Sequence, residues 1–299
     1  MDAVVSSDTV MTSSPSLWSR FHRLWARRET VRYLTSSNLK AGHRDKVLGH
    51  LWNLLDPLMF MLVYYFVFGI LFNQVGGQRS ADYMLYLFIG LLAWNFISGS
   101  IQQATLCIRS NRGLILEINF PKTVFPVSVA LARLYDYVWG IVILFVFLIA
   151  AGVWPTWHVL WLPVLIIIAL LFTTGVSMIV AYLGAFFADT SNVVNVALRL
   201  MFYCSPLFYY VRDVTKTVVE NGVSKEIVVH HALIHNPLYW NIYMSNPVAC
   251  MFECLRDVLL WGREPDPRLL AYAATVSVVI FLAGFAIFSK NEGKFAKYI

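Results

Sequence analysis

The sequence predicts an all-α integral membrane protein with six transmembrane helices, an N-terminal amphipathic interface helix and both termini in the cytoplasm. Two observations predict the class. Of the 299 residues, 59% are hydrophobic and 13% are charged, against about 45–50% and about 25% in typical soluble domains. The apolar residues also form runs of about 20, the length that an α-helix needs to cross roughly 30 Å of hydrocarbon. The placement of Lys and Arg then predicts the orientation.

The N-terminal region divides into two parts. Residues 1–16 are rich in Ser and Thr and lack hydrophobic periodicity, which predicts a disordered tail. Residues 17–50 are predicted to form a cytoplasmic interface segment that begins with a helix lying on the membrane surface. That helix has apolar side chains at Leu17, Phe21, Leu24 and Trp25 on one face and basic ones at Arg20, Arg23 and Arg27 on the other.

Residues 51–299 are predicted to form the six-helix transmembrane domain. The candidate spans are about 51–72, 83–108, 125–150, 160–187, 193–211 and 269–289. No Asp, Glu, Lys or Arg occurs between Tyr137 and Ala188, a stretch that holds most of two spans with a turn at 154–158. The fifth span is interrupted by Arg199 and Pro206.

Basic residues are concentrated on alternate connections. The segment 17–50 carries eight Lys and Arg, the loop 109–122 carries Arg109, Arg112 and Lys122, and the tail carries Lys290, Lys294 and Lys297. These segments are therefore predicted to be cytoplasmic. The segment 212–268 balances six basic against seven acidic residues. It is predicted to be external, partly helical and lying on the membrane, with a re-entrant hairpin around 236–262 as the alternative.

Several function classes lack their sequence signature. There is no GxxxxGK[ST] motif for a nucleotide and no motif or residue order typical of a catalytic site. The basic residues flank apolar spans, whereas nucleic-acid sites cluster them on a soluble face. The four cysteines lack zinc spacing and are interpreted as packing residues, and His230, His231 and His235 are interpreted as solvated loop residues. We therefore expect that this chain is not an enzyme and that it binds no metal, no nucleic acid and no cofactor.

Ionisable side chains inside spans are costly in hydrocarbon and usually face the bundle interior or a water-filled path. Arg133 and Asp136 are three residues apart and can share a helix face, which predicts an intramembrane ion pair rather than a substrate contact. Arg199 has no acidic neighbour within two helical turns, so it either faces a pathway or packs against the bundle. Pro206, with Ser205 before it, would kink the fifth span and is a candidate gate.

Aromatic rings offer flat apolar surfaces that can line a pathway as well as anchor helices at the lipid boundary. The candidates for such a pathway are Tyr64, Tyr65, Trp94, Phe96, Tyr203, Tyr209 and Tyr210. For each of them, anchoring at the membrane interface or packing between helices is the alternative.

Six short motifs occur in order along residues 38–299. They are Asn38-Leu39-Lys40 with Val47-Leu48-Gly49, Trp52 and Pro57; Asn119-Phe120-Pro121-Lys122; Phe187-Ala188-Asp189; Phe202-Tyr203-Cys204-Ser205-Pro206-Leu207; Asn246-Pro247 with Glu253 to Arg256; and the tail Phe288 to Phe295. Together they resemble the ABC-2 type permeases that export polysaccharides, the group of O-antigen, teichoic acid and galactan exporters. The chain departs from that pattern at Gly42-His43, near Lys46 and at Ala188.

The resemblance implies an ABC-2 (type V) exporter fold in a bacterial cytoplasmic membrane. It implies a homodimer with two separate ABC ATPase subunits, which would bind the ATP and Mg²⁺, and a lipid-linked polysaccharide carried on a polyprenyl diphosphate. It also makes the loop 109–122 a coupling loop. The residues expected to contact the ATPase are Arg112, Leu114, Ile115, Glu117, Ile118, Asn119 and Pro121.

Three other functions compete with this interpretation. One is an ABC-2 permease for a drug or a small lipid, which would lack a wide, aromatic-lined channel. Another is a membrane-embedded glycosyltransferase or acyltransferase, which would need convergent acidic or His residues near the membrane surface. A secondary transporter would need ionisable relays at mid-membrane and inverted repeats.

Overall fold

The computed structural model describes residues 22, 24–43, 51–71, 80–117, 120–212, 214–220, 223–230 and 236–295. The helices are α2 (Arg28–His43), α3 (Leu51–Tyr64), the π-helix η1 (Tyr65–Leu71), α4 (Ser80–Ala104), α5 (Cys107–Ser110), α6 (Arg112–Glu117), α7 (Val124–Ala150), the 3₁₀ turn η2 (Trp157–Trp161), α8 (Leu162–Phe186), α9 (Thr190–Tyr203), α10 (Pro237–Met244), α11 (Pro247–Leu259), α12 (Pro267–Asn291) and the 3₁₀ turn η3 (Glu292–Lys294). The strands are β1 (Val214–Glu220) and β2 (Val223–His230). The predicted tail at 1–16 lies outside the described residues.

Four helical segments of the described chain are long and apolar enough to cross a membrane. They are Ala81–Ala104, Val124–Ala150, Trp157–Phe186 and Pro267–Lys294. They coincide with the second, third, fourth and sixth predicted spans. The chain is therefore a multi-pass, predominantly helical membrane protein.

The first and fifth predicted spans are shorter than the other four. The first continues from α3 into the π-helix η1, so the helical path runs from Leu51 to Leu71. The fifth, α9, has 14 residues and is therefore about 21 Å long, less than the roughly 30 Å of a bilayer core. It ends at Tyr203 because Pro206 lacks an amide hydrogen and restricts the residue before it. The kink expected at Pro206 is thus the end of a helix.

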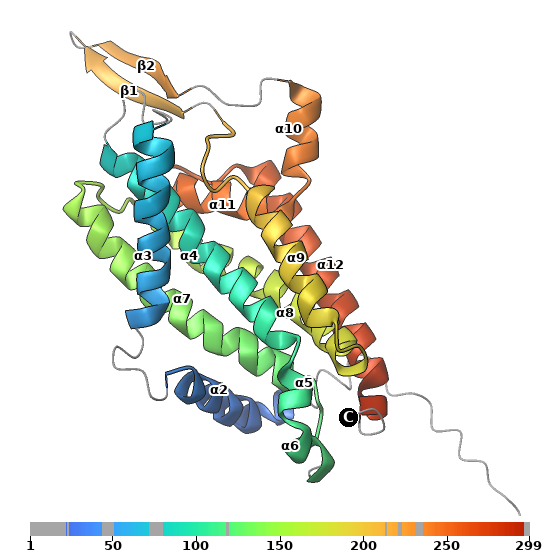
Figure 1. The fold of residues 1–299 in the computed structure, drawn as a ribbon. Coiled ribbons are helices and arrows are strands. Elements are labelled where there is room, and N and C mark those ends of the chain that lie inside the picture. The colour runs from blue at the N-terminus through green and yellow to red at the C-terminus, as the bar shows by residue number, and fades with distance from the viewer. Residues whose placement is uncertain are drawn as a thin grey trace, which may run out of the picture.

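The helices form one bundle with two distinct ends (Figure 1). One end carries α2, α5, α6 and the C-terminal turn η3, and we call it the α6 end. The opposite end carries β1, β2, α10 and α11, and we call it the hairpin end. α4 and α8 are the most buried spans, whereas α7 and α12 expose most of their length. Most of their exposed side chains are apolar, as expected for surfaces that face lipid.

Small residues allow a close contact between α8 and α12. A Cβ atom on Gly284 of α12 would overlap the carbonyl oxygen of Gly175 on α8, and a Cβ on Gly175 would overlap the backbone of Phe281. Without side chains at these positions the two backbones can touch, which is a common way of packing helices in membranes.

The segment 212–268 departs from the all-α prediction. β1 and β2 form a two-stranded antiparallel hairpin, rich in the β-branched residues Val, Thr and Ile. Two helices follow, in the region where a helical hairpin was one of the two expectations. Every residue of α11 from Val248 to Leu259 is buried. This helix is therefore an internal part of the bundle and not a surface element.

The interface segment is anchored on α7. Val31 and Leu34 of α2 are buried, whereas Trp25 and Tyr33 are exposed. Asn38 donates a hydrogen bond from Nδ2 to Oγ of Ser128 on α7, at 3.2 Å. α2 therefore has one packed face and one exposed face. The amphipathic helix predicted to begin at Leu17 is a different segment: Leu17 and Phe21 lie outside the described residues, and Trp25 of its apolar face is exposed.

Candidate functional site

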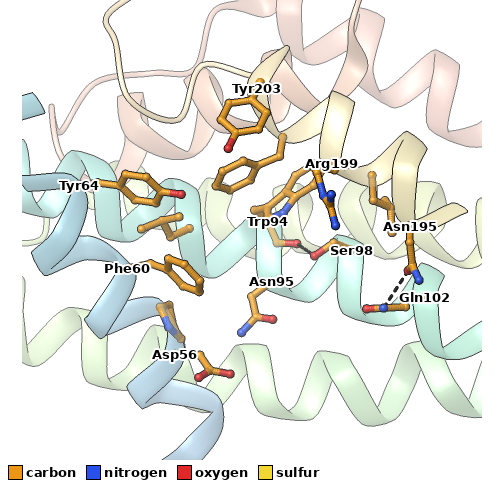
Figure 2. A pocket seen from close by; sticks show the side chains of 14 residues that line it. Asp56, Phe60, Tyr64, Trp94, Asn95, Ser98, Gln102, Asn195, Arg199 and Tyr203 are labelled. Atoms are coloured by element: carbon orange, nitrogen blue, oxygen red, sulfur yellow. Dashed lines mark hydrogen bonds between the residues drawn. The ribbon is translucent and has the colours of Figure 1, made fainter. Parts of the chain in front are cut away.

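A groove of about 520 Å³ is formed by α3, α4 and α9. α4 lies at its base, and α3 and α9 supply the two sides, as Figure 2 shows. One wall is polar and one is aromatic, and each wall draws on more than one helix.

The polar wall is built from two short series of side chains. On α4, Asn95, Ser98 and Gln102 are spaced by three and four residues, which places them on one helical face. On α9, Asn195 and Arg199 are four residues apart and share a face in the same way. Gln102 donates from Nε2 to Oδ1 of Asn195 at 2.8 Å, so the two series are joined (Figure 2).

Arg199 lines the groove and has no partner among the residues that the structure describes. Its side chain is exposed, and no hydrogen bond or ion pair joins it to the part of the chain that the structure describes. Asp56 of α3 lines the same groove at a separate position (Figure 2). Because an isolated cation is costly in hydrocarbon, the groove must supply water or an anion at this position.

The aromatic wall includes three of the seven predicted pathway residues. Tyr64 of α3, Trp94 of α4 and Tyr203 of α9 all line the groove, together with Phe60 and Phe202. The Phe202 ring lies 5.6 Å from Trp94 and 6.1 Å from Tyr64, measured between ring centroids. The rings form a connected apolar surface that can accept the face of a sugar.

The other four pathway candidates lie elsewhere. Phe96 is buried and stacks on Tyr137 of α7 at 5.1 Å. Tyr65 opens η1 and is half-buried against the core. Tyr209 and Tyr210 lie beyond the end of α9, in the segment described below. For these four residues the structure shows packing positions rather than the groove lining.

The predicted intramembrane ion pair is on α7. Arg133 and Asp136 line a small cavity between α4 and α7. Arg133 donates from Nε to Oε1 of Gln103 on α4 at 3.0 Å. The structure therefore gives Arg133 a neutral partner across the helix interface, and the ion pair with Asp136 stays a prediction.

The predicted coupling loop contains a helix. α6 follows α5 after Asn111 and spans Arg112–Glu117. Ile115 is buried, whereas Leu114 and Glu117 are exposed. Ile118 and Asn119 lie outside the described residues. α6 thus presents apolar and charged side chains outward at the tip of the α6 end (Figure 1).

The chain after α6 is fixed to the C-terminal turn. The amide of Lys122, which follows Pro121, donates to Oε2 of Glu292 at 3.0 Å. Phe120 is buried against Phe125, at the start of α7, with ring centroids 5.5 Å apart. These contacts hold one side of the loop to α7 and to η3, the turn that follows α12, so the loop is connected to both helices.

The two gate candidates begin a non-helical segment, residues 204–212, which we call the strap. Ser205 is fully buried, and its Oγ accepts a hydrogen bond from Nδ2 of Asn246 at 3.1 Å. Phe208 places its ring 4.3 Å from Tyr64 and 5.2 Å from Phe202, between centroids. The strap therefore contacts two groove-lining residues at the hairpin end.

A buried charged cluster on α11 was missed from the sequence. Arg256 has no exposed surface, and its Nη1 donates to Oε1 of Glu253 at 3.0 Å. Burial raises the pKa of the Glu253 carboxyl, although the nearby Arg256 cation opposes this. Asp257 is ion-paired with Arg212 at 3.0 Å and with Arg263 at 2.6 Å. The spacing of three residues between Glu253 and Arg256, which makes them neighbours on a helix, was the sequence feature that could have predicted this ion pair.

The cysteines and histidines offer no metal ligand set among the residues that the structure describes. All four cysteines are free thiols, and Cys107, Cys250 and Cys254 are buried. His230 ends β2, while His231 and His235 lie outside the described residues.

The chain is similar to known membrane transport proteins. The ABC-2 type transporter family matches residues 29–219. The chain is 30% identical over 266 residues to the O-antigen export system permease protein RfbA of Myxococcus xanthus, covering 89% of this chain and 94% of that protein. It is 26% identical to the protein of the same name from Klebsiella pneumoniae, with 89% and 93% covered. It is 20% identical over 251 residues to the polysialic acid transport protein KpsM of Escherichia coli, with 82% and 86% covered.

Proposed function

We propose, from the premise that this chain belongs to the ABC-2 type transporter family, that it is the permease subunit of an ATP-driven polysaccharide exporter. The observation that carries the proposal is the similarity to O-antigen export permeases, which extends over 89% of this chain and 94% of the first relative. Because nearly the whole of both proteins is aligned, the similarity includes the spans, the groove and the α6 loop.

The groove between α3, α4 and α9 is the proposed path of the polysaccharide. Its polar wall offers amide and hydroxyl groups that can exchange hydrogen bonds with sugar hydroxyls. Its aromatic wall offers stacking surfaces that can contact a sugar ring whatever the identity of the sugar. A polymer of many repeats has to pass without being held at one place, and weak, repeated contacts of these two kinds suit that requirement.

A second copy of this chain is proposed to close the groove. The groove is flanked by exposed apolar side chains on both sides, among them Val63 on α3, Phe66 on η1, and Val196 and Leu200 on α9. Pairing through these surfaces would bury apolar area on both copies and enclose the path. An isologous dimer is the simplest assembly that does this.

Energy is proposed to come from two ABC ATPase subunits. The chain has no phosphate-binding GxxxxGK[ST] motif, so nucleotide and Mg²⁺ belong to the partner. The exposed side of α6, with Arg112, Leu114 and Glu117, is the proposed contact with that partner. Ile118, Asn119 and Pro121 complete the proposed contact, which would convert closure of the ATPases into rigid-body movement of the spans.

The substrate is proposed to be a long glycan linked to a polyprenyl diphosphate, such as an O antigen, a teichoic acid or a galactan, and the site of action the bacterial cytoplasmic membrane. Both termini would then be cytoplasmic, and the hairpin end external. Arg199 is a cation available to a phosphate group that enters the groove, because charge-assisted hydrogen bonds to phosphate are strong.

The test is copurification followed by transport. The chain would be expressed with a candidate ABC ATPase from its genomic neighbourhood, isolated in lipid nanodiscs and examined for a bound Walker-motif subunit. Cells that lack the chain would be assayed for cell-surface polysaccharide, with an ATPase variant lacking its Walker Lys as the control. We expect a complex with two ATPases per two permeases and surface polysaccharide that requires hydrolysis.

Two results would contradict the proposal. One is a chain that never captures an ATPase. The other is a complex whose ATPase activity responds to small amphiphiles while the surface polysaccharide is unchanged, which would indicate a permease for a drug or a small lipid.

A further inference from the structure

The backbone groups of the strap, residues 204–212, lack the regular hydrogen-bond partners that a helix provides. It is buried over most of its length, with no exposed surface at Ser205, Leu207 and Val211. Buried backbone groups need partners, and a segment outside helices and sheets has to find them among side chains. Within the described residues, one backbone bond lies inside the strap, from the amide of Leu207 to the carbonyl of Ser205 at 2.7 Å.

Two tyrosines of α4 supply partners for consecutive strap carbonyls. The hydroxyl of Tyr83 donates to the carbonyl oxygen of Phe208 at 2.7 Å. The hydroxyl of Tyr86 donates to the carbonyl oxygen of Tyr209 at 2.6 Å. Both tyrosines are almost fully buried, so the bonds are shielded from water and neither donor has solvent as an alternative.

Arg256 of α11 completes the arrangement. Its Nη1 donates to the hydroxyl oxygen of Tyr86 at 2.7 Å, and its Nη2 lies 3.5 Å from the carbonyl oxygen of Leu207. Its Cζ lies 3.4 Å from the centroid of the Tyr86 ring. A Cβ atom on Gly90 would lie 2.8 Å from Nη2, so the absence of a side chain there makes room for the guanidinium.

The hydroxyl of Tyr86 thus connects three parts of the chain. It accepts from Arg256 of α11, donates to the strap and is carried by α4. A hydroxyl that accepts from a cation becomes a stronger donor, because hydrogen bonds in a chain polarise one another. The hydrogen bond from the Tyr86 hydroxyl to the carbonyl of Tyr209 is therefore stronger than it would be without Arg256.

The position of the strap matters for the groove. Phe208 contacts the groove-lining rings of Tyr64 and Phe202, and the carbonyl of Phe208 is held by Tyr83. Displacing the strap would move the Phe208 ring and change the width of the groove at the hairpin end.

We infer that Tyr86, supported by Tyr83 and Arg256, is a positioning residue that fixes the strap and thereby sets the hairpin-end opening of the groove. The inference rests on the proposed function, in that the groove is the transport path. These residues act through the strap and make no contact with the groove themselves.

Tyr86→Phe is the sharpest test, because it removes one oxygen atom and keeps the ring. Tyr137→Phe is the matched control, since Tyr137 is also buried and its hydroxyl has no hydrogen bond within the described chain. Both variants would be prepared with the ATPase partner in lipid nanodiscs. Amide hydrogen exchange of peptides covering the strap, and of reference peptides from α8 and α12, would be measured by mass spectrometry.

We expect the strap peptide of Tyr86→Phe to exchange about five- to tenfold faster than that of the natural protein, as for loss of one hydrogen bond. Tyr83→Phe combined with Tyr86→Phe should exchange faster still. The reference peptides should be unchanged, and Tyr137→Phe should match the natural protein. In transport assays, Tyr86→Phe should lower polysaccharide exported per ATP hydrolysed while basal hydrolysis stays the same.

Two outcomes would overturn the inference. Strap exchange that is unchanged in the double variant would mean that the hydroxyls do not hold it. Equal acceleration in all peptides would mean that Tyr86 acts on overall stability. A natural complex that exports nothing would contradict the proposed function instead, and the exchange measurement would still report on the strap.

Discussion

Arg199→Gln should change the electrostatic potential of the groove by an amount that can be worked out. A sphere of the groove's volume, about 520 Å³, has a diameter of about 10 Å. At that distance the interaction of two unit charges is about 0.4 kcal/mol in water and about 1.7 kcal/mol at an effective dielectric constant near 20. The interaction energies of the Arg199 charge with reagents of charge −1 and +1 differ by twice that value. Removing the Arg199 charge should therefore change their relative reaction rate by about fourfold to a few hundredfold.

The assay uses a thiol placed in the groove. Ser98→Cys would be introduced into a chain whose four native cysteines are replaced by Ser or Ala, and modified with methanethiosulfonate reagents of either charge. The ratio of anionic to cationic rates should be high with Arg199, fall in Arg199→Gln and stay high in Arg199→Lys. Asp56→Asn should raise it, because Asp56 lines the same groove.

The control is Lys290→Gln, which removes one positive charge from the last turn of α12, outside the groove. The reasoning would be refuted by a ratio that is the same in Arg199→Gln and in the natural background, or that falls equally in Lys290→Gln. Either result would mean that the charge of Arg199 does not govern the groove.

Three further predictions concern other parts of the chain. Glu117→Lys, or deletion of residues 113–118, should abolish export while leaving membrane insertion intact, measured by surface polysaccharide and membrane fractionation. Maleimide should label Cys204, which is exposed, but not Cys250, because burial raises the pKa of the Cys250 thiol to about 11; equal labelling would contradict this. Gly184→Ala should lower the yield of folded protein severalfold in size-exclusion chromatography, since a Cβ there would overlap the carbonyl oxygen of Thr105.

The sequence predicted the spanning helices because their signal is local. Length and apolar content identify a membrane helix whatever it packs against, and four predicted spans are found as long apolar helices. The end of α9 was harder to place, because a proline in a membrane helix can kink it or end it. Only the packing of the strap decides between the two.

The groove was predictable in part. Trp94 and Arg199 were identified because a ring or a charge in a span is conspicuous. The stripe of Asn95, Ser98 and Gln102 was missed, although its spacing of three and four residues within an uncharged span was a signal. Phe96 was assigned to the pathway because its residue type fitted, but it stacks on Tyr137 of α7 and is not among the residues that line the groove.

The charged cluster at the hairpin end was not predictable to the same degree. Asp257 is matched by Arg212 and Arg263, and Arg212 lies 45 residues away in sequence. Charges read from the sequence alone suggest a solvated external segment, since charged residues are seldom buried unless paired. Pairing across such a separation is a property of the folded chain. The sequence therefore left two expectations for this segment, a surface element or a re-entrant hairpin around 236–262, and could not place α11 in the interior with its charges paired.

α4 connects the three regions that the proposed function needs. Its 25 residues give a helix about 37 Å long. None of these residues is a proline. Tyr83 and Tyr86 hold the strap at one end, Asn95 to Gln102 line the groove, and the other end leads through α5 into α6. A straight helix is hard to compress, so a displacement of α6 reaches the strap as a shift or a rotation of α4. A shift would slide the polar stripe along α3 and α9, and a rotation would turn it. In the proposed function, the loop, the groove and the strap therefore respond together.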